Sequence, residues 1–128
     1  MAQVGYVCLG TNDFDRACAF WDALAPELGG KKLFPTPHGV MYRLGAGPMI
    51  MVTRPHNGEA SHPGNGTMLA INVDAEEEVA RIYDKALSLG AACEGKPGPR
   101  GAFGEFAYFR DLDNNKIAVF FSARQKKS

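Results

Sequence analysis

The chain has 128 residues, of which 45% are hydrophobic and 22% charged, and its formal net charge is zero because 14 basic residues balance 14 acidic ones. These values are typical of one ordinary globular domain. Nucleic-acid partners are not expected, because binding to phosphates requires a basic face. The basic cluster at 124–128 lies at the chain end, where a solvated tail is expected.

No stretch of the sequence resembles a membrane or targeting segment. Apolar runs fall short of the roughly 20 residues that cross a bilayer, and Met1–Gly5 lacks the regions of a signal peptide. The cysteines Cys8, Cys18 and Cys93 are odd in number and form no C-x-x-C pair, which favours reduced thiols. We therefore expect a cytoplasmic protein without membrane contact.

The first half of the chain predicts a strand, a helix and three more strands. Residues 4–10 are typical of a strand, and Thr11-Asn12-Asp13 offers an N-cap for a helix with an apolar stripe that continues to residue 28. Gly29-Gly30 ends this helix. Three extended segments are predicted after it: 31–34, 39–44 and 49–53.

The second half repeats this order after a Pro-, Gly- and His-rich linker. A strand is predicted over 67–73, and Asp74-x-x-Glu77 resembles a capping box at the start of a helix that Gly90 ends. The later segments are strands at 91–94, 106–110 and 116–121, with a Pro/Gly loop at 96–104.

The repeat is visible in the letters, since residues 6–25 overlay 68–87 without a gap and place Trp21 on Tyr83. One half alone is too small to bury its sheet. We predict an α+β fold in which two βαβββ modules form a curved mixed sheet, with helices on the convex face and a concave cavity. The expected single domain spans 1–128, with module one at about 1–54, a linker at 55–65 and module two at about 66–124.

Two segments resemble the glyoxalase, bleomycin-resistance and dioxygenase superfamily, also called the vicinal-oxygen-chelate superfamily. Gly5–Ala17 resembles the opening strand and helix of that family, and Phe109–Ile117, with the letters FRDLDNNKI, resembles its closing hairpin. The resemblance implies the two-module fold and a homodimer. In members with chemistry it also implies one divalent metal that acts as a Lewis acid on the concave face.

The family's ligand positions can be placed on this chain residue by residue. A thioether is a soft donor and a methyl group is none, so the residues present do not suit a hard divalent ion. The resemblance therefore predicts no metal and no other cofactor here. In place of the two histidines and two glutamates implied by the family stand Tyr6, Met51, Met68 and Ala118.

Strand alternation places further residues beside these four positions on one face. The face is apolar and rich in methionine, which predicts a pocket for a small apolar or aromatic molecule. The same side chains could instead fill the cavity as a core, and the arginines could meet an anionic ligand or be solvated. The candidate ligand-binding residues are Tyr6, Cys8, Arg43, Met49, Met51, Thr53, Met68, Asn72, Arg100, Ala118 and Phe120.

Three functions are open on the sequence alone: a metal-free small-molecule binder, a metal-dependent lyase, isomerase or dioxygenase, and a structural or partner-binding module with a filled cavity. His38, His56 and His62 have no third ligand at a useful spacing, and surface histidines are expected. The acidic run after Arg110 lacks the glycine and glutamate of a calcium loop, so a hairpin turn is expected. The sequence does not identify the ligand, any remaining catalysis, or whether modules pair within or between chains.

Overall fold

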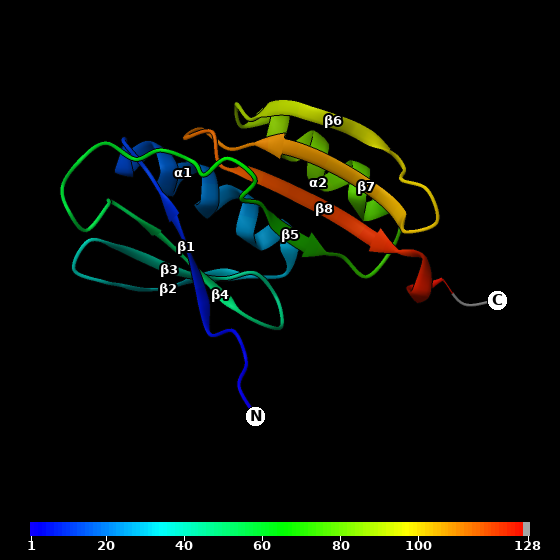
Figure 1. Cartoon of the computed structure of the whole chain (residues 1–128), viewed down its shortest axis with the longest axis horizontal. Helices are drawn as coiled ribbons and strands as arrows, with labels where there is room; N and C mark the ends of the chain where they lie inside the picture. The colour runs from blue at the N-terminus through cyan, green and yellow to red at the C-terminus, as the bar shows by residue number, and fades with distance from the viewer. Residues whose placement is uncertain (127–128) are drawn as a thin grey trace. The chain divides into compact units, whose positions relative to one another are not determined.

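The computed structural model describes residues 1–126, so the last two residues of the predicted basic tail lie outside the described part. The chain divides into two compact units, Met1–Pro63 and Gly64–Ser128. Each unit is a βαβββ module with its own four-stranded mixed sheet (Figure 1). The predicted α+β class and the repeated element order are thereby confirmed.

Module one contains one long helix packed on one sheet. The sheet order is β1-β4-β3-β2, with β1 parallel to β4 and the other neighbours antiparallel. The helix α1 contacts β3 and β4 of this sheet. The elements are β1 (Tyr6–Gly10), α1 (Phe14–Leu24), the 3-10 helix η1 (Ala25–Leu28), β2 (Lys31–Pro35), β3 (Gly39–Arg43) and β4 (Met49–Thr53).

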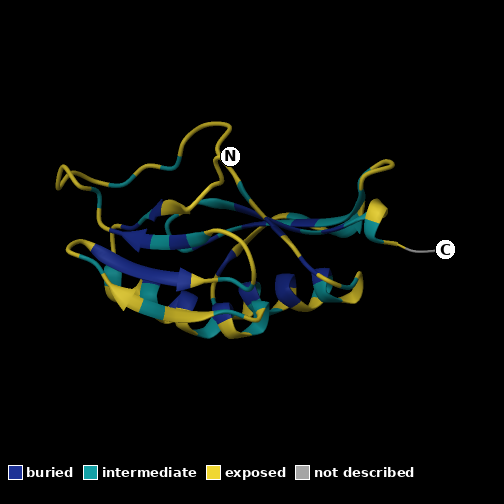
Figure 2. Ribbon diagram, turned by 90° about the horizontal axis from the view of Figure 1, so that it is seen from below, coloured by how far each residue is buried: buried dark blue, intermediate teal, exposed yellow. Residues whose placement is uncertain are grey.

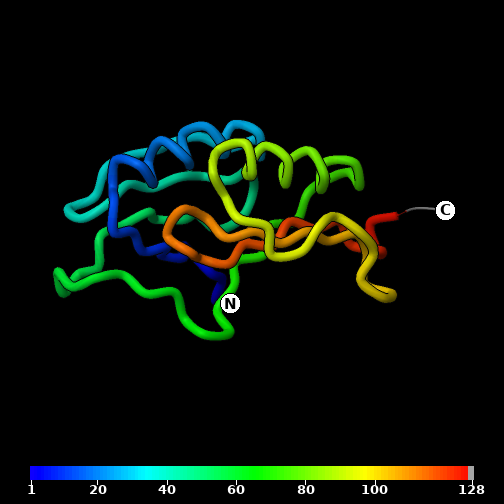
Figure 3. Tube along the Cα trace, turned by 90° about the horizontal axis from the view of Figure 1, so that it is seen from above, coloured from blue at the N-terminus to red at the C-terminus, as the bar shows by residue number. Residues whose placement is uncertain are grey.

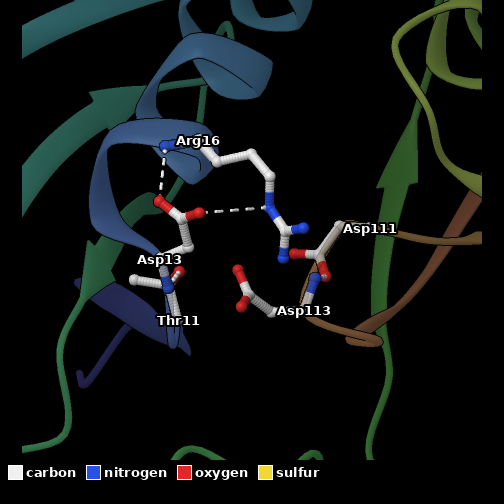
Figure 4. A network of polar contacts seen from close by, with 5 residues as sticks. All are labelled: Thr11, Asp13, Arg16, Asp111 and Asp113. Carbon is white, nitrogen blue, oxygen red and sulfur yellow. Dashed lines mark hydrogen bonds and ion pairs between the residues drawn. The ribbon is translucent and has the colours of Figure 1, made fainter.

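Local sequence explains both ends of α1. Asp13 is the N-cap, and its carboxylate accepts a hydrogen bond from the Arg16 backbone N–H at 3.1 Å and lies 3.8 Å from the Arg16 guanidinium (Figure 4). The predicted helix continues to residue 28, whereas α1 ends at Leu24. Pro26 has no N–H to continue the α-helical pattern, so the chain tightens into a 3-10 turn that Gly29 ends at φ 78°.

Module two has the same architecture. Its sheet order is β5-β8-β7-β6, with β5 parallel to β8. The helix α2 contacts β6, β7 and β8. The elements are β5 (Leu69–Asn72), α2 (Glu77–Ser88), β6 (Ala92–Pro99), β7 (Gly104–Arg110), β8 (Lys116–Ser122) and the 3-10 helix η2 (Ala123–Gln125).

Two predictions for module two are wrong. The capping box does not form, because α2 begins after Glu76, which has helical φ and ψ and makes no side-chain cap. The predicted loop at 96–104 is shorter than expected, since β6 continues to Pro99 with register shifts near Gly95 and Gly98, and only residues 100–103 lie outside the strands. Glycine and proline indicate irregular backbone, but antiparallel pairing with β7 keeps residues 96–99 in the sheet.

The core of each module lies between its helix and its sheet (Figure 2). Trp21 on α1 is 1% exposed and Tyr83 on α2 is 6% exposed, which confirms that the two overlaid residues face their sheets. The segment from 54 to 68 contains no helix or strand (Figure 3). Neither described helix is long and apolar enough to cross a bilayer.

The turn between β7 and β8 is organised by one buried carboxylate. Asp111 is 7% exposed and accepts hydrogen bonds from the backbone N–H groups of Asp113 and Asn115 and from the Asn115 amide, at 2.9 to 3.0 Å. Burial raises the pKa of Asp111, while the bonds from Asn115 oppose that shift. The run is therefore a hairpin turn built on side-chain to backbone bonds, as predicted.

Candidate functional site

Strand alternation in module one separates residues that face α1 from residues that face away. Tyr42 lies on the α1 side, because its hydroxyl donates to Asp22 at 2.7 Å, and its neighbour Ile50 shares that side. The residues that alternate with Tyr42 and Ile50 along these strands face away from α1. We call this surface the open face of module one; it consists of Tyr6, Cys8, Met41, Arg43, Met49, Met51 and Thr53.

The predicted site residues of module one therefore lie together. Tyr6 pairs with Met49 and Cys8 with Met51 across the parallel strands, and Arg43 pairs with Met49 on the other side. Tyr6 is 52% exposed, while the two methionines are half-buried. The surface is thus an apolar, sulfur-rich patch that is open on the side of β1.

Two predicted polar groups are already used within the chain. The Thr53 hydroxyl lies 2.8 Å from the carbonyl oxygen of Arg54 and 3.2 Å from that of His38, so its single proton has acceptors inside the protein. The Asn72 amide donates to the Gln125 side chain at 2.6 Å and joins β5 to η2. Neither side chain is a free donor for a ligand, so their predicted role is weakened.

In module two the corresponding surface is aromatic. The α2 side of the sheet carries residues that are fully buried, among them Phe109, Ile117 and Val119. Ala70 pairs with Ala118 on the other side, and Ala118 itself is fully buried. We call this other side the open face of module two; it includes Ala70, Asn72, Phe106, Tyr108, Arg110, Lys116, Ala118 and Phe120.

Three half-buried rings form a row across β7 and β8. The rings of Phe106 and Phe120 stack with centroids 4.9 Å apart at 10°, and Phe106 and Tyr108 lie 6.1 Å apart at 21°. Of this aromatic row, defined as Phe106, Tyr108 and Phe120, only Phe120 is among the residues predicted from the sequence. The alternation of Phe106 with Tyr108 in the predicted strand was the signal that could have found the others.

Cationic side chains border the aromatic row. The Arg100 guanidinium carbon is 5.4 Å from the Tyr108 ring centroid and the Lys116 Nζ is 5.3 Å from it. Arg100 also donates to the backbone carbonyls of Lys96 and Pro99 in β6, at 2.8 and 3.2 Å. Arg110 donates to Glu94 at 2.9 Å, and this bond holds the pKa of Glu94 below its ordinary value. Arg100 is thus held beside the Tyr108 ring, and it remains a candidate residue for binding an anionic ligand.

The strand pairing makes Met51 and Ala118 equivalent positions of the two modules. Cys8 pairs with Met51 in module one, and the overlaid residue Ala70 pairs with Ala118 in module two. Met68 precedes β5, in contrast to the predicted strand from 67, and is 43% exposed.

These residues do not fit a divalent metal. Methionine and alanine supply no hard donor, and a single phenol does not make a site. Over residues 1–126, no group of three or more His, Cys, Asp or Glu side chains could hold a metal ion. No chemical step through a metal follows from this donor set.

The repeated βαβββ unit and the closing FRDLDNNKI hairpin define a protein of the glyoxalase fold class. The chain belongs to the Glyoxalase/Bleomycin resistance protein/Dioxygenase superfamily, whose family model matches residues 3–119. The resemblance drawn from the two segments is confirmed by this match. No curated protein matches the chain significantly.

Solved structures of the same family share the fold. A glyoxalase/bleomycin resistance protein from Albidiferax ferrireducens T118 is 29% identical, with a TM-score of 0.82 over 91% of this chain and 96% of that one. A glyoxalase-related enzyme from Fulvimarina pelagi is 24% identical, with a TM-score of 0.78 over 95% and 89%. A mutant of the fosfomycin resistance protein FosX from Listeria monocytogenes, complexed with Mn(II) and 1S,2S-dihydroxypropylphosphonic acid, is 16% identical, with a TM-score of 0.76 over 98% and 96%.

Proposed function

We propose that this chain is a metal-independent binding protein for a small apolar or aromatic molecule. The observation that carries the proposal is the aromatic row on the open face of module two, where stacked, half-buried rings lie on the side of the sheet opposite α2. Flat aromatic ligands stack on such rings with a gain beyond simple burial. The methionine-rich open face of module one offers a second adaptable apolar surface.

The donor set supports binding over metal-dependent lyase, isomerase or dioxygenase chemistry. Such chemistry needs oxygen or nitrogen ligands that hold the ion and leave a position for the substrate. Tyr6, Met51, Met68 and Ala118 do not supply them. We further propose that the protein is a homodimer and is located in the cytoplasm.

The aromatic row can be tested by screening flat bicyclic aromatic compounds for binding by ligand-detected NMR and then mapping amide shifts. Phe106→Ala should weaken binding at least about fivefold, because it removes the central stacking partner. Phe103→Ala is the matched control, since Phe103 is 75% exposed and lies outside the row. Equal affinity of both variants, or no bound compound at all, would contradict binding at the row and favour a structural role.

Metal analysis tests the second part of the proposal. The untagged protein, purified without chelators, should contain well under one equivalent of Zn, Ni, Mn or Fe. A stoichiometric metal that survives dialysis and supports turnover would overturn the metal-independent function and restore the enzymatic alternative.

A further inference from the structure

Module one contains two adjoining cavities at the end of its sheet where β3 begins and β4 ends. A polar cavity of about 340 Å³ lies between the residues that precede α1, the β2–β3 turn and the segment after β4. An apolar cavity of about 360 Å³ lies beside it, against α1, β2 and β3. Phe14 and Arg54 line both cavities, so the two spaces meet at these side chains.

The polar cavity gathers three side chains that can bind an anion. The rings of His38 and His56 lie 5.4 Å apart in an edge-to-face arrangement, and the Arg54 guanidinium lies 4.2 Å over the Phe14 ring. Within the described residues, the side chains of these three basic residues form no ion pair or hydrogen bond. Glu59 is the one carboxylate that lines this cavity. All three basic side chains are exposed, so their N–H groups are open to a ligand.

Hydrogen bonds fix the wall of this cavity before any ligand arrives. Asn12 and Ser61 form a reciprocal pair at 2.6 and 3.1 Å, which ties the segment after β4 to the residues that precede α1. The backbone N–H of Arg54 donates to the His38 carbonyl at 2.9 Å. Because the stretch from 54 to 61 is held at both of its ends, a ligand does not have to order it, which lowers the entropic cost of binding.

The apolar cavity provides room for the body of such a ligand. Leu33, Phe34 and Val40 line it together with the Phe14 ring. Phe34 is 49% exposed, although it is a large apolar side chain. An apolar group placed here would remove this surface from water while its charged end reached Arg54.

We propose that module one has a second binding site, which takes a small carboxylic acid with an apolar body. The carboxylate lies against Arg54, His38 and His56, where the planar guanidinium offers paired donors. The body lies against Phe14 and Phe34. Phe34 pairs with Met41 of the open face of module one, so the apolar end of this site borders that face, whereas Arg54, His38 and His56 lie outside it. The site goes beyond the proposed function.

The test compares 4-phenylbutyrate with 4-phenylbutanol, which has the same body without the charge, by amide-detected NMR titration of the full chain. The acid should shift the signals of residues 14, 38, 54 and 56 saturably, and the alcohol should bind at least tenfold more weakly. Arg54→Gln should weaken binding of the acid about tenfold or more, while Arg81→Gln, on α2, should leave it unchanged. Phe34→Ala should weaken binding of both compounds.

Three outcomes would overturn the second site: no saturable shift near Arg54, equal binding of acid and alcohol, or equal effects of the two arginine variants. Shifts confined to Phe106, Tyr108 and Phe120 would also overturn it while supporting the open face of module two. Loss of binding in a variant counts only when its amide spectrum is that of a folded chain. The Arg54→Lys variant separates the paired hydrogen bonds of the guanidinium from the effect of its positive charge. It should bind 4-phenylbutyrate more weakly than the parent and more tightly than Arg54→Gln.

Discussion

The two modules have the same strand pairing but different open faces. Gly39 pairs with Thr53 in module one, and at the equivalent place Phe106 pairs with Phe120 in module two. A Cβ on Gly39 would collide with the Val52 carbonyl oxygen, so this position excludes any side chain. The same strand pairing therefore holds two stacked rings in module two, whereas in module one a glycine leaves the position without a side chain. This difference is why the proposed aromatic site lies in module two.

At one helix-facing position the two modules differ by a single hydroxyl. Tyr42 pairs with Ile50 in module one, and Phe109 pairs with Ile117 at the equivalent place in module two. Tyr42 is fully buried, and its hydroxyl contacts Asp22 at 2.7 Å. Phe109 is also fully buried but has no polar group to satisfy. The same core position is thus polar in one module and apolar in the other.

The largest expected effect concerns the overlaid aromatic residues of the helices. Trp21→Ala should cost about 3 to 5 kcal/mol in the free energy of unfolding, because a large buried ring leaves a cavity. Tyr83→Ala should give a comparable loss if the modules are equivalent, and Trp21→Phe should cost much less. Urea denaturation measures all three. If iodide readily quenched Trp21 fluorescence, Trp21 would be exposed, which would contradict its place on the side of α1 that faces the sheet.

A smaller effect is expected at the position where the open faces differ. Gly39→Ala should destabilise the protein by about 1 to 3 kcal/mol, because strand backbone must move to admit the methyl group. Gly5→Ala is the matched control and should be close to neutral, since a Cβ at Gly5 would have no atom within 4 Å. Equal stability of the two variants would show that β3 and β4 can separate at Gly39.

The buried hydroxyl should have a lesser effect still. Tyr42→Phe should cost about 1 to 2 kcal/mol, because it removes a hydrogen bond to a carboxylate. Phe109→Tyr tests the reverse change, since Asp84 overlays Asp22 in the repeat. Thermal melting of both variants measures the asymmetry. A neutral Tyr42→Phe variant would mean that water satisfies Asp22 equally well.

The same hydroxyl makes a prediction about pH. Burial, followed by the bond to Asp22, raises the pKa of Tyr42 above its ordinary value of about 10. The unfolded chain therefore loses this proton first, and stability falls as pH rises above about 10. Tyr42→Phe should show a shallower decline over that range, measured by urea unfolding. Parallel curves for the parent and the variant would contradict the raised pKa.

The smallest effect is a difference in thiol reactivity. Cys8 and Cys93 are exposed, whereas Cys18 on α1 is half-buried and burial raises the pKa of its thiol. The thiolate is the reactive form, so iodoacetamide at about pH 8 should modify Cys18 last. Peptide mass spectrometry follows the order of modification. Labelling of Cys18 first would show that α1 opens from its sheet.

The sequence by itself determined the elements whose signal is local. Helical spacing placed Trp21 and Tyr83 on their sheets, and the cap at Asp13 set the start of α1. The overlay of the halves correctly paired the positions of Met51 and Ala118. Each of these features depends on residues a few places apart or on the repetition of one pattern, so no long-range contact was needed to predict it.

Only the tertiary structure decided which residues of distant segments meet. The sequence did not predict the aromatic row. The alternation of side chains along a strand shows which residues share a face, but it does not show which neighbouring strand contributes the next ring. His38 and His56 are surface histidines, as predicted, but only the pairing of β3 with β4 shows that their rings lie side by side. The loop predicted at 96–104 is confined to residues 100–103 for the same reason, because pairing with β7 keeps residues 96–99 in β6 despite the local preference of glycine and proline.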